Sequence, residues 1–127
     1  MSLNNKELLA KMSPVTTKCL QAKGYLCFID VLIAMGYLSE KTYEDWRFKR
    51  IPYLERGVSL NLSKSNFLLR SFHKNCVNGK LKPSITAYKS WGKCRKLDLK
   101  FSKSGDPKLE KSYATRFISQ QKIRKEI

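Results

Sequence analysis

The side chains of this sequence most able to do chemistry are lysines and arginines, because they gather in one stretch of the chain. Residues 64–103 contain eleven of them and a single acid, Asp98. A cationic excess of this kind needs counterions or an anionic partner, and the phosphate backbone of a nucleic acid is such a partner. We expect eight residues of this stretch to contact phosphates: Lys80, Lys82, Lys89, Lys93, Arg95, Lys96, Lys100 and Lys103.

Lysine dominates the stretch, since Arg95 is the one arginine among the nine cations from Lys74 to Lys103. An ammonium group is a flexible point charge, whereas a guanidinium can bond a guanine at two points. The composition therefore favours contacts with phosphates and weak sequence selectivity. The alternative is a solvated surface that only keeps the protein in solution.

A second group of cations is interleaved with aromatic residues in residues 43–56. Arg47 and Arg50 lie there, next to three large rings, Trp46, Phe48 and Tyr53. Two predicted helices joined by a glycine turn resemble the opening of a helix-turn-helix unit, whose second helix would offer Lys41, Arg47 or Arg50 to a DNA groove. The alternative is an ordinary packed helical hairpin, with the aromatic residues in the core.

Residues 102–107 place hydroxyls, a lysine and a glycine before a predicted helix, which is one way to hold a phosphate. Asp106 would cap that helix, however, and its charge would repel an anion. We therefore interpret the segment as a turn from a strand to a helix, with Pro107 at the first helical position.

Catalysis and metal binding find little support in the residue pattern. His73 is the single histidine, and we expect it to have an ordinary role in an amphipathic helix. Asp106 and Glu110 share a helix face and could begin a magnesium site, but capping explains Asp106 more simply. No phosphate-binding loop and no dinucleotide-binding glycine motif is present, so we predict no cofactor and no enzyme activity.

The four cysteines are spaced unlike the ligands of a zinc site, and the chain is unlike a secreted disulfide scaffold. We therefore expect Cys19, Cys27, Cys76 and Cys94 to be reduced and structural. The most apolar stretch, residues 25–38, is shorter than the roughly 20 residues of a membrane-spanning helix. We predict a cytoplasmic protein with no transmembrane segment.

With 127 residues, 42% of them hydrophobic, the chain has the size and composition of one domain with a real core. We predict a single domain over residues 1–127, with residues 1–12 and 119–127 at its periphery.

Hydrophobic periodicity and capping residues predict helices through most of the chain. The expected helices cover residues 4–12, 14–23, 25–35, 39–48 and 64–77, with a short helical turn at residues 53–58. Gly24, Gly36 and Gly79 are expected to end three of them, and Ser63 is expected to cap the helix over residues 64–77.

Beyond residue 83 the apolar period changes. Residues 85–91 and 97–101 alternate in the manner of half-buried strands on either side of a short loop with a glycine, which predicts a hairpin. A last helix is expected from Pro107 to residue 118. The predicted fold class is α+β: a mostly helical bundle with a two-stranded β-hairpin near the C-terminal third, and a winged-helix variant as one form of it.

Two segments resemble parts of an uncharacterised family of small bacterial proteins. They are W-R-F-K-R-I-P-Y-L-E-R at residues 46–56 and F-S-K-S-G-D-P-K-L-E at residues 101–110, with Trp91-Gly92-Lys93 between them. The likeness covers residues 28–118 and implies a bacterial source, with no activity to carry over. Where these proteins have a glycine in the first segment, this chain has Lys49.

These patterns favour a non-catalytic nucleic-acid-binding protein, for DNA or RNA, that works mainly through phosphate-backbone contacts. The alternative is a protein–protein adaptor whose basic face docks an acidic partner or an anionic surface. A small nuclease or transferase is a third hypothesis, which would need Asp106 or Glu110 and a divalent ion.

Overall fold

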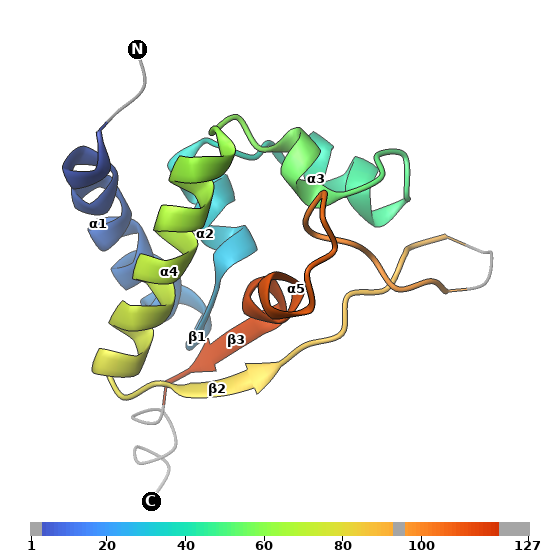
Figure 1. Ribbon diagram of the computed structural model, residues 1–127. Coiled ribbons are helices and arrows are strands. Elements are labelled where there is room, and N and C mark those ends of the chain that lie inside the picture. The colour runs from blue at the N-terminus through green and yellow to red at the C-terminus, as the bar shows by residue number, and fades with distance from the viewer. Residues whose placement is uncertain (1–3, 93–95, 120–127) are drawn as a thin grey trace, which may run out of the picture.

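The computed structural model describes residues 4–92 and 96–119 and builds them from helices around a small sheet (Figure 1). In chain order the elements are α1 (Asn5–Lys23), β1 (Tyr25–Cys27), α2 (Phe28–Met35), α3 (Glu40–Arg47), the 3-10 helix η1 (Leu54–Gly57), α4 (Leu62–Asn78), β2 (Lys82–Ile85), α5 (Pro107–Ala114) and β3 (Thr115–Ile118). The α+β class and its mostly helical character are therefore confirmed.

The sheet has three antiparallel strands in the order β1-β3-β2. Leu26 pairs with Phe117 on one side of β3, and Pro83 pairs with Phe117 on the other. β2 is an edge strand with all four residues exposed. The predicted two-stranded hairpin is therefore wrong as the sheet of this fold, since the strands that pair come from three distant parts of the chain.

Residues 115–118 were expected to extend the last helix and instead form the central strand. The i+4 spacing of Tyr113 and Phe117 fits a helix, but Thr115 and Phe117 are buried while Arg116 and Ile118 are only half-buried, which is the alternation of a strand. The β-branched Thr115 is also suited to that conformation. Pairing on both sides outweighs the helical spacing.

Residues 25–27 were expected to begin a buried helix and instead form β1, because they pair with β3. Gly24 has φ +79°, a conformation that glycine adopts freely, and it reverses the chain between α1 and β1. The buried helix itself is present, but it starts at Phe28.

A single helix, α1, replaces the two that Pro14 was expected to separate. Asn4 and Glu7 form a reciprocal capping box at its start, and Leu8 and Met12 are fully buried along one face. Proline removes one backbone donor in the helix interior, but the packing of this continuous apolar face keeps the helix intact.

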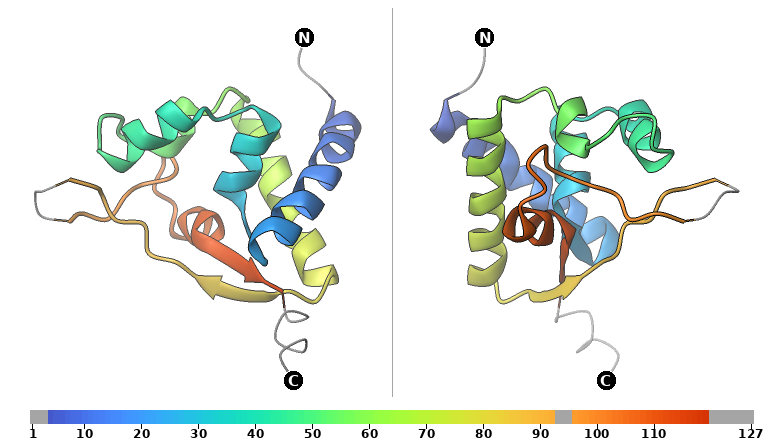
Figure 2. Two further views of the ribbon diagram at one scale, coloured as in Figure 1. Left: turned by 180° about the vertical axis from the view of Figure 1, so that it is seen from behind. Right: turned by 45° about the vertical axis from the view of Figure 1, so that its right-hand side comes forward.

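The predicted hairpin over residues 85–101 is not a regular ladder. Its described residues form two loosely bonded segments, residues 86–92 and 96–101, which we call the arm. Its two sides run antiparallel and share one isolated bridge, between Lys89 and Asp98. Hydrogen bonds of 2.8 Å from Ser90 N to Leu97 O and 3.0 Å from Leu99 N to Tyr88 O add to it. The arm extends away from the helices on the side opposite α1 (Figures 1 and 2).

The core is a continuous chain of aromatic rings that reaches from the sheet to the arm. Phe28, Phe72 and Tyr113 are fully buried. The ring centroids of Phe72 and Tyr113 lie 5.5 Å and 5.8 Å from that of Phe28. Phe101 of the arm stacks on Tyr113 at 5.3 Å with nearly parallel rings. The base of the arm is thus part of the hydrophobic core.

Capping follows the sequence at most helix ends. Asn4, Ser39 and Asp106 accept backbone bonds as caps, and Gly24 and Gly36 end their helices in the left-handed conformation. The expected cap Ser63 is wrong, because Asn61 accepts the bond from Lys64 N at 2.9 Å and α4 begins at Leu62.

Two lysines take left-handed backbone conformations. Lys49 and Lys80 each have φ +60°, where a side chain is usually unfavourable. The tight turn after α3 is therefore made with Lys49 in a backbone conformation that glycine adopts more easily.

Within residues 4–92 and 96–119, none of the helices has both the length and the apolar character needed to cross a bilayer.

Candidate nucleic-acid interface

Backbone hydrogen bonds fix the base of the arm to α3 and η1. The indole Nε1–H of Trp46 donates to Lys100 O at 2.8 Å, and Leu54 N donates to the same oxygen at 3.1 Å. Trp91 N donates to Arg47 O at 2.7 Å on the other side of the arm. Trp46 is fully buried, so the arm is held against a rigid part of the body.

Two carboxylates bind the segment that returns from the arm. Glu110 accepts hydrogen bonds from Phe101 N at 2.9 Å, from Ser102 N at 2.7 Å and from Ser102 Oγ at 2.6 Å. Glu55 accepts from the hydroxyl of Tyr113 at 2.8 Å and from Lys103 N at 3.2 Å. Both acids therefore serve to position the chain, and Glu110 is not paired with Asp106 in a metal site.

Residues 102–107 form a turn into α5, as the sequence suggested, but the segment before them belongs to the arm and is not a strand. Ser102 Oγ accepts from Gly105 N at 3.0 Å, and Asp106 caps α5 by accepting from Lys108 N at 3.3 Å. Because the carboxylate of Asp106 occupies the N-terminus of α5, that end repels an anion.

The described cations of the arm and its base are exposed and close together in the chain. Lys89 forms an ion pair with Asp98. Lys96 Nζ donates to Gly92 O at 2.9 Å, and Lys100 Nζ donates to Lys103 O at 3.0 Å. These last two bonds leave the charges of Lys96 and Lys100 unneutralised. Lys93 and Arg95, which were also predicted to bind phosphates, lie outside the described residues.

Lys80 and Lys82 belong to a different part of the surface. They are exposed where α4 leads into β2, while the arm begins at the other end of β2 (Figure 1). The extended chain from Lys82 to Lys89 spans roughly 20 Å. The predicted set therefore divides into a group on the arm and a group at the sheet. Arg116, which was not among the predicted residues, belongs to the second group because it pairs with Ser84 in the sheet. Its guanidinium carbon lies 4.3 Å from the ring centroid of Tyr25.

Arg47 lies in a cage of aromatic rings between α3 and residues 88–91 of the arm. Its guanidinium carbon is 4.7 Å from the ring centroid of Trp91 and 5.4 Å from that of Tyr88. Tyr43 adds a third ring at 5.9 Å. The Nε of Arg47 is buried and has no hydrogen-bond partner within the described residues, so the rings are the main surroundings of this cation.

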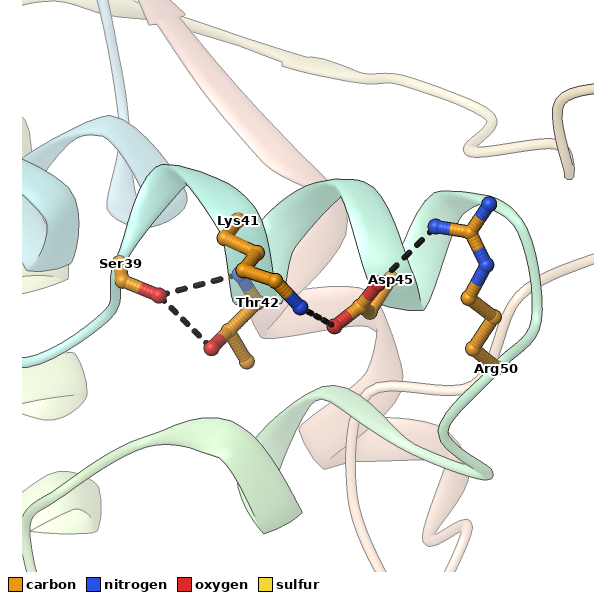
Figure 3. A network of polar contacts seen from close by, with 5 residues as sticks. All are labelled: Ser39, Lys41, Thr42, Asp45 and Arg50. Carbon is orange, nitrogen blue, oxygen red and sulfur yellow. Dashed lines mark hydrogen bonds and ion pairs between the residues drawn. The ribbon is translucent and has the colours of Figure 1, made fainter.

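Arg50 lies beyond the C-terminal end of α3, in the turn that Lys49 makes. It donates to Asp45 at 3.0 Å, and Lys41 approaches the other carboxylate oxygen of Asp45 at 3.4 Å (Figure 3). Its guanidinium carbon also lies 4.8 Å from the ring centroid of Phe48. Hydrogen bonding to Arg50, with Lys41 nearby, lowers the pKa of Asp45 and keeps this carboxylate ionised.

The aromatic residues near these arginines divide into buried and exposed ones. Trp46 is buried, as a core residue should be, whereas Phe48 is 41% exposed and Trp91 is 39% exposed. We call Tyr43, Arg47, Phe48, Arg50, Tyr88 and Trp91 the aromatic–cation cluster. The alternation of basic and aromatic residues near positions 46–50 and 88–93 was the signal for it, but the sequence does not show that the two segments meet.

The described cysteine and histidine side chains occupy structural positions, and Cys94 lies outside the described residues. Cys19, Cys27 and Cys76 are free thiols, and burial raises the pKa of Cys27 to about 11 and that of Cys76 to about 12. His73 Nε2 donates to the carbonyl of Ser112 at 2.8 Å. Among the residues that the structure describes, no group of three or more His, Cys, Asp and Glu side chains is arranged to hold a metal ion.

His73 also lines an open groove of about 430 Å³ between α4 and α5. Arg70 and Lys108 contribute cations to it, and Asp106 contributes an acid. The mixed charges and the capping role of Asp106 make this groove a weaker place for a polyanion than the arm.

Comparison of the chain with protein-family models, with curated proteins and with solved structures finds no match. The resemblance to small bacterial proteins therefore stays a prediction from the sequence.

Proposed function

We propose that this protein binds nucleic acid without catalysing a reaction, mainly through phosphate contacts of the arm. One observation supports the proposal most: exposed lysines cluster on and beside a projecting arm with little acid to neutralise them. Lys89 is paired with Asp98, whereas Lys96, Lys100 and Lys103 have no ion pair with any acid in the described parts of the chain.

The wider charge balance supports the same proposal. The chain has a net charge of +16, and only four ion pairs form within residues 4–92 and 96–119. Phosphates brought against unpaired lysines release condensed counterions, which favours binding at low salt. In this proposal the arm takes the part that the winged-helix variant gives to a wing, because it carries cations beyond the helical body.

The proposal is tested by fluorescence anisotropy with a labelled 20-nucleotide single strand and the matching duplex, from 25 to 200 mM salt. We expect binding that weakens steeply with salt, by a logarithmic slope of about −0.9 per neutralised phosphate on the duplex and about −0.7 on the single strand.

Two double charge reversals locate the surface. K96E/K103E changes the arm and its base, and K6E/K18E makes the same change in net charge on the exposed side of α1, on the far side of the molecule (Figure 1). We expect K96E/K103E to weaken binding at 50 mM salt by about tenfold or more and to flatten the salt slope, while K6E/K18E has a much smaller effect.

Equal losses from the two double variants would mean that charge acts only at long range, and no binding to either probe at 25 mM salt would end the proposal. The protein would also be tested after nuclease treatment has removed any bound nucleic acid. If it then captures an acidic protein and binds neither probe, the adaptor alternative is favoured.

A further inference from the structure

The aromatic–cation cluster exposes two rings that an ordinary core would bury. Trp91 and Phe48 are 39% and 41% exposed, and their ring centroids lie 5.6 Å apart at an angle of 78°. They come from the arm and from the end of α3, which are held together by the bond from Trp91 N to Arg47 O. Exposed rings next to a basic arm form a surface that water can cover or that another flat group can contact.

A guanidinium lies against each of these rings. Arg47 is 4.7 Å from the ring centroid of Trp91, and Arg50 is 4.8 Å from that of Phe48. In the described parts of the chain Arg47 makes no ion pair, so its charge is available to an anion near the rings. The cluster thus combines flat apolar faces with positive charge within one small area.

The rings are fixed in place before any ligand arrives. Trp91 packs edge-on against Tyr43 at 5.9 Å, and Gly92 passes beside Phe48 with φ +119°. A side chain at position 92 would be strained in that conformation, so glycine allows the arm to approach Phe48. Rings that are already ordered lose little conformational entropy on binding.

We propose that this cluster binds the bases of single-stranded nucleic acid, with Trp91 and Phe48 as stacking surfaces and the arm lysines on the adjoining phosphates. The inference rests on the proposed function and narrows its ligand. Single strands expose the faces of their bases, whereas a duplex keeps them stacked inside. Stacking on an aromatic ring is also tolerant of sequence, which agrees with the weak selectivity expected from the lysines.

An acidic or aromatic segment of a protein is the main competing occupant, since Trp, Tyr and Arg also dominate protein interfaces. The phosphate-binding arm next to the cluster favours the nucleic acid. Lys96 lies near the cluster, because its Nζ donates to the carbonyl of Gly92, the residue after Trp91, so a strand stacked on Trp91 has this cation beside it.

The experiment uses the full chain, labelled oligo(dT) and oligo(U) of 12 nucleotides, and a duplex of equal length. The chain has two tryptophans, of which Trp46 is buried, so quenching of the exposed Trp91 reports base stacking. We expect single strands to quench the fluorescence and to bind more tightly than the duplex.

Two substitutions at one position separate stacking from packing. W91L keeps apolar bulk and removes the indole, while W91F keeps a ring. We expect W91L to weaken single-strand binding by about tenfold with an unchanged salt slope, because stacking releases no counterions, and W91F to stay close to the parent chain. Similar melting temperatures of the two variants show that both fold.

Four outcomes would overturn the inference, and they differ in whether the proposed function survives. Tight binding that does not quench Trp91, or equal loss of affinity in W91L and W91F, removes the stacking site and leaves the phosphate-binding function. Tighter binding of the duplex than of the single strands would contradict the proposal that the ligand is single-stranded. Absence of binding to all three probes at low salt removes the proposed function and the inference together.

Discussion

Replacing Glu110 by glutamine should detach the foot of the arm from the body. The carboxylate accepts three hydrogen bonds, from Phe101 N, Ser102 N and Ser102 Oγ, at 2.6–2.9 Å. An amide keeps one oxygen and turns an NH₂ group toward donors, so at least one partly buried N–H or O–H loses its acceptor. Hydrogen bonds to charged groups contribute about 1.5–3 kcal/mol each, and this partly exposed site falls near the lower end.

We therefore expect E110Q to lower the free energy of unfolding by about 2 kcal/mol, which for a domain of this size corresponds to roughly 7 °C in Tm. Thermal and urea unfolding followed by circular dichroism measure this change. Glu44 is exposed and makes no side-chain bond to any other described residue, so E44Q is the matched control with the same loss of charge. Equal stability of E110Q and E44Q would refute the role assigned to Glu110.

Local effects distinguish release of the arm from general destabilisation. Hydrogen exchange should speed up at the backbone amides of Phe101 and Ser102 in E110Q well before it does so in α1. Uniform acceleration throughout the chain would mean that Glu110 supports the whole fold and not the arm in particular.

Three further predictions follow from single features. W46F should lower stability by about 2 kcal/mol in urea unfolding, because it removes buried volume and the indole bond to the arm; an unchanged midpoint would contradict this. K49G should raise stability by up to about 1 kcal/mol because it relieves a left-handed φ, whereas K41G inside α3 should lower it by about 1 kcal/mol; the same sign for both would show that the turn is not strained. Stability should change little from neutral pH to about pH 9 and should fall as the pH rises toward 11–12, because the folded chain raises the pKa of Cys27 and Cys76 and favours their neutral thiols; C76A should reduce the slope of this fall in unfolding measurements between pH 8 and 11.

The sequence predicted local structure well where a residue decides its own neighbourhood. Ser39 and Asp106 cap helices, and Gly24 and Gly36 end them, because each of these preferences depends on a few adjacent backbone groups. Pro14 is the exception, because the packing of a whole helix face against the core outweighs one missing backbone donor.

The sheet could not be predicted for a physical reason. β1 and β2 are short, and neither is identifiable without β3, whose residues also fit a helical period. Pairing across the length of the chain selects between the two conformations, and that energy is not visible in local patterns. In the arm, a local pattern predicted a strand that did not form. Residues 97–101 alternate clearly between apolar and polar, but they do so because Leu99 and Phe101 pack into the body, and the arm has no regular ladder of hydrogen bonds.

For the candidate site, the sequence indicated the charge and the rings near Arg47, but it did not show that Trp91 joins them. Lysines at positions 80–103 were evident, but extended chain separates Lys82 from the arm. The contacts that bring Trp91 to Arg47 and Phe48 depend on how the arm returns to α3, and residues so far apart in sequence cannot be paired without a fold.

The order of the strands has a consequence for biosynthesis. β3 is the last strand to leave the ribosome, and it is also the one that both of its neighbours need. Until Thr115–Ile118 emerges, β1 and β2 have no partner, and Phe28 and Phe72 lack the cover that Tyr113 and Phe117 later provide. A nascent chain therefore keeps its strands unpaired and its core incompletely covered until Thr115–Ile118 has been synthesised, and the sheet and the core then form together in one step.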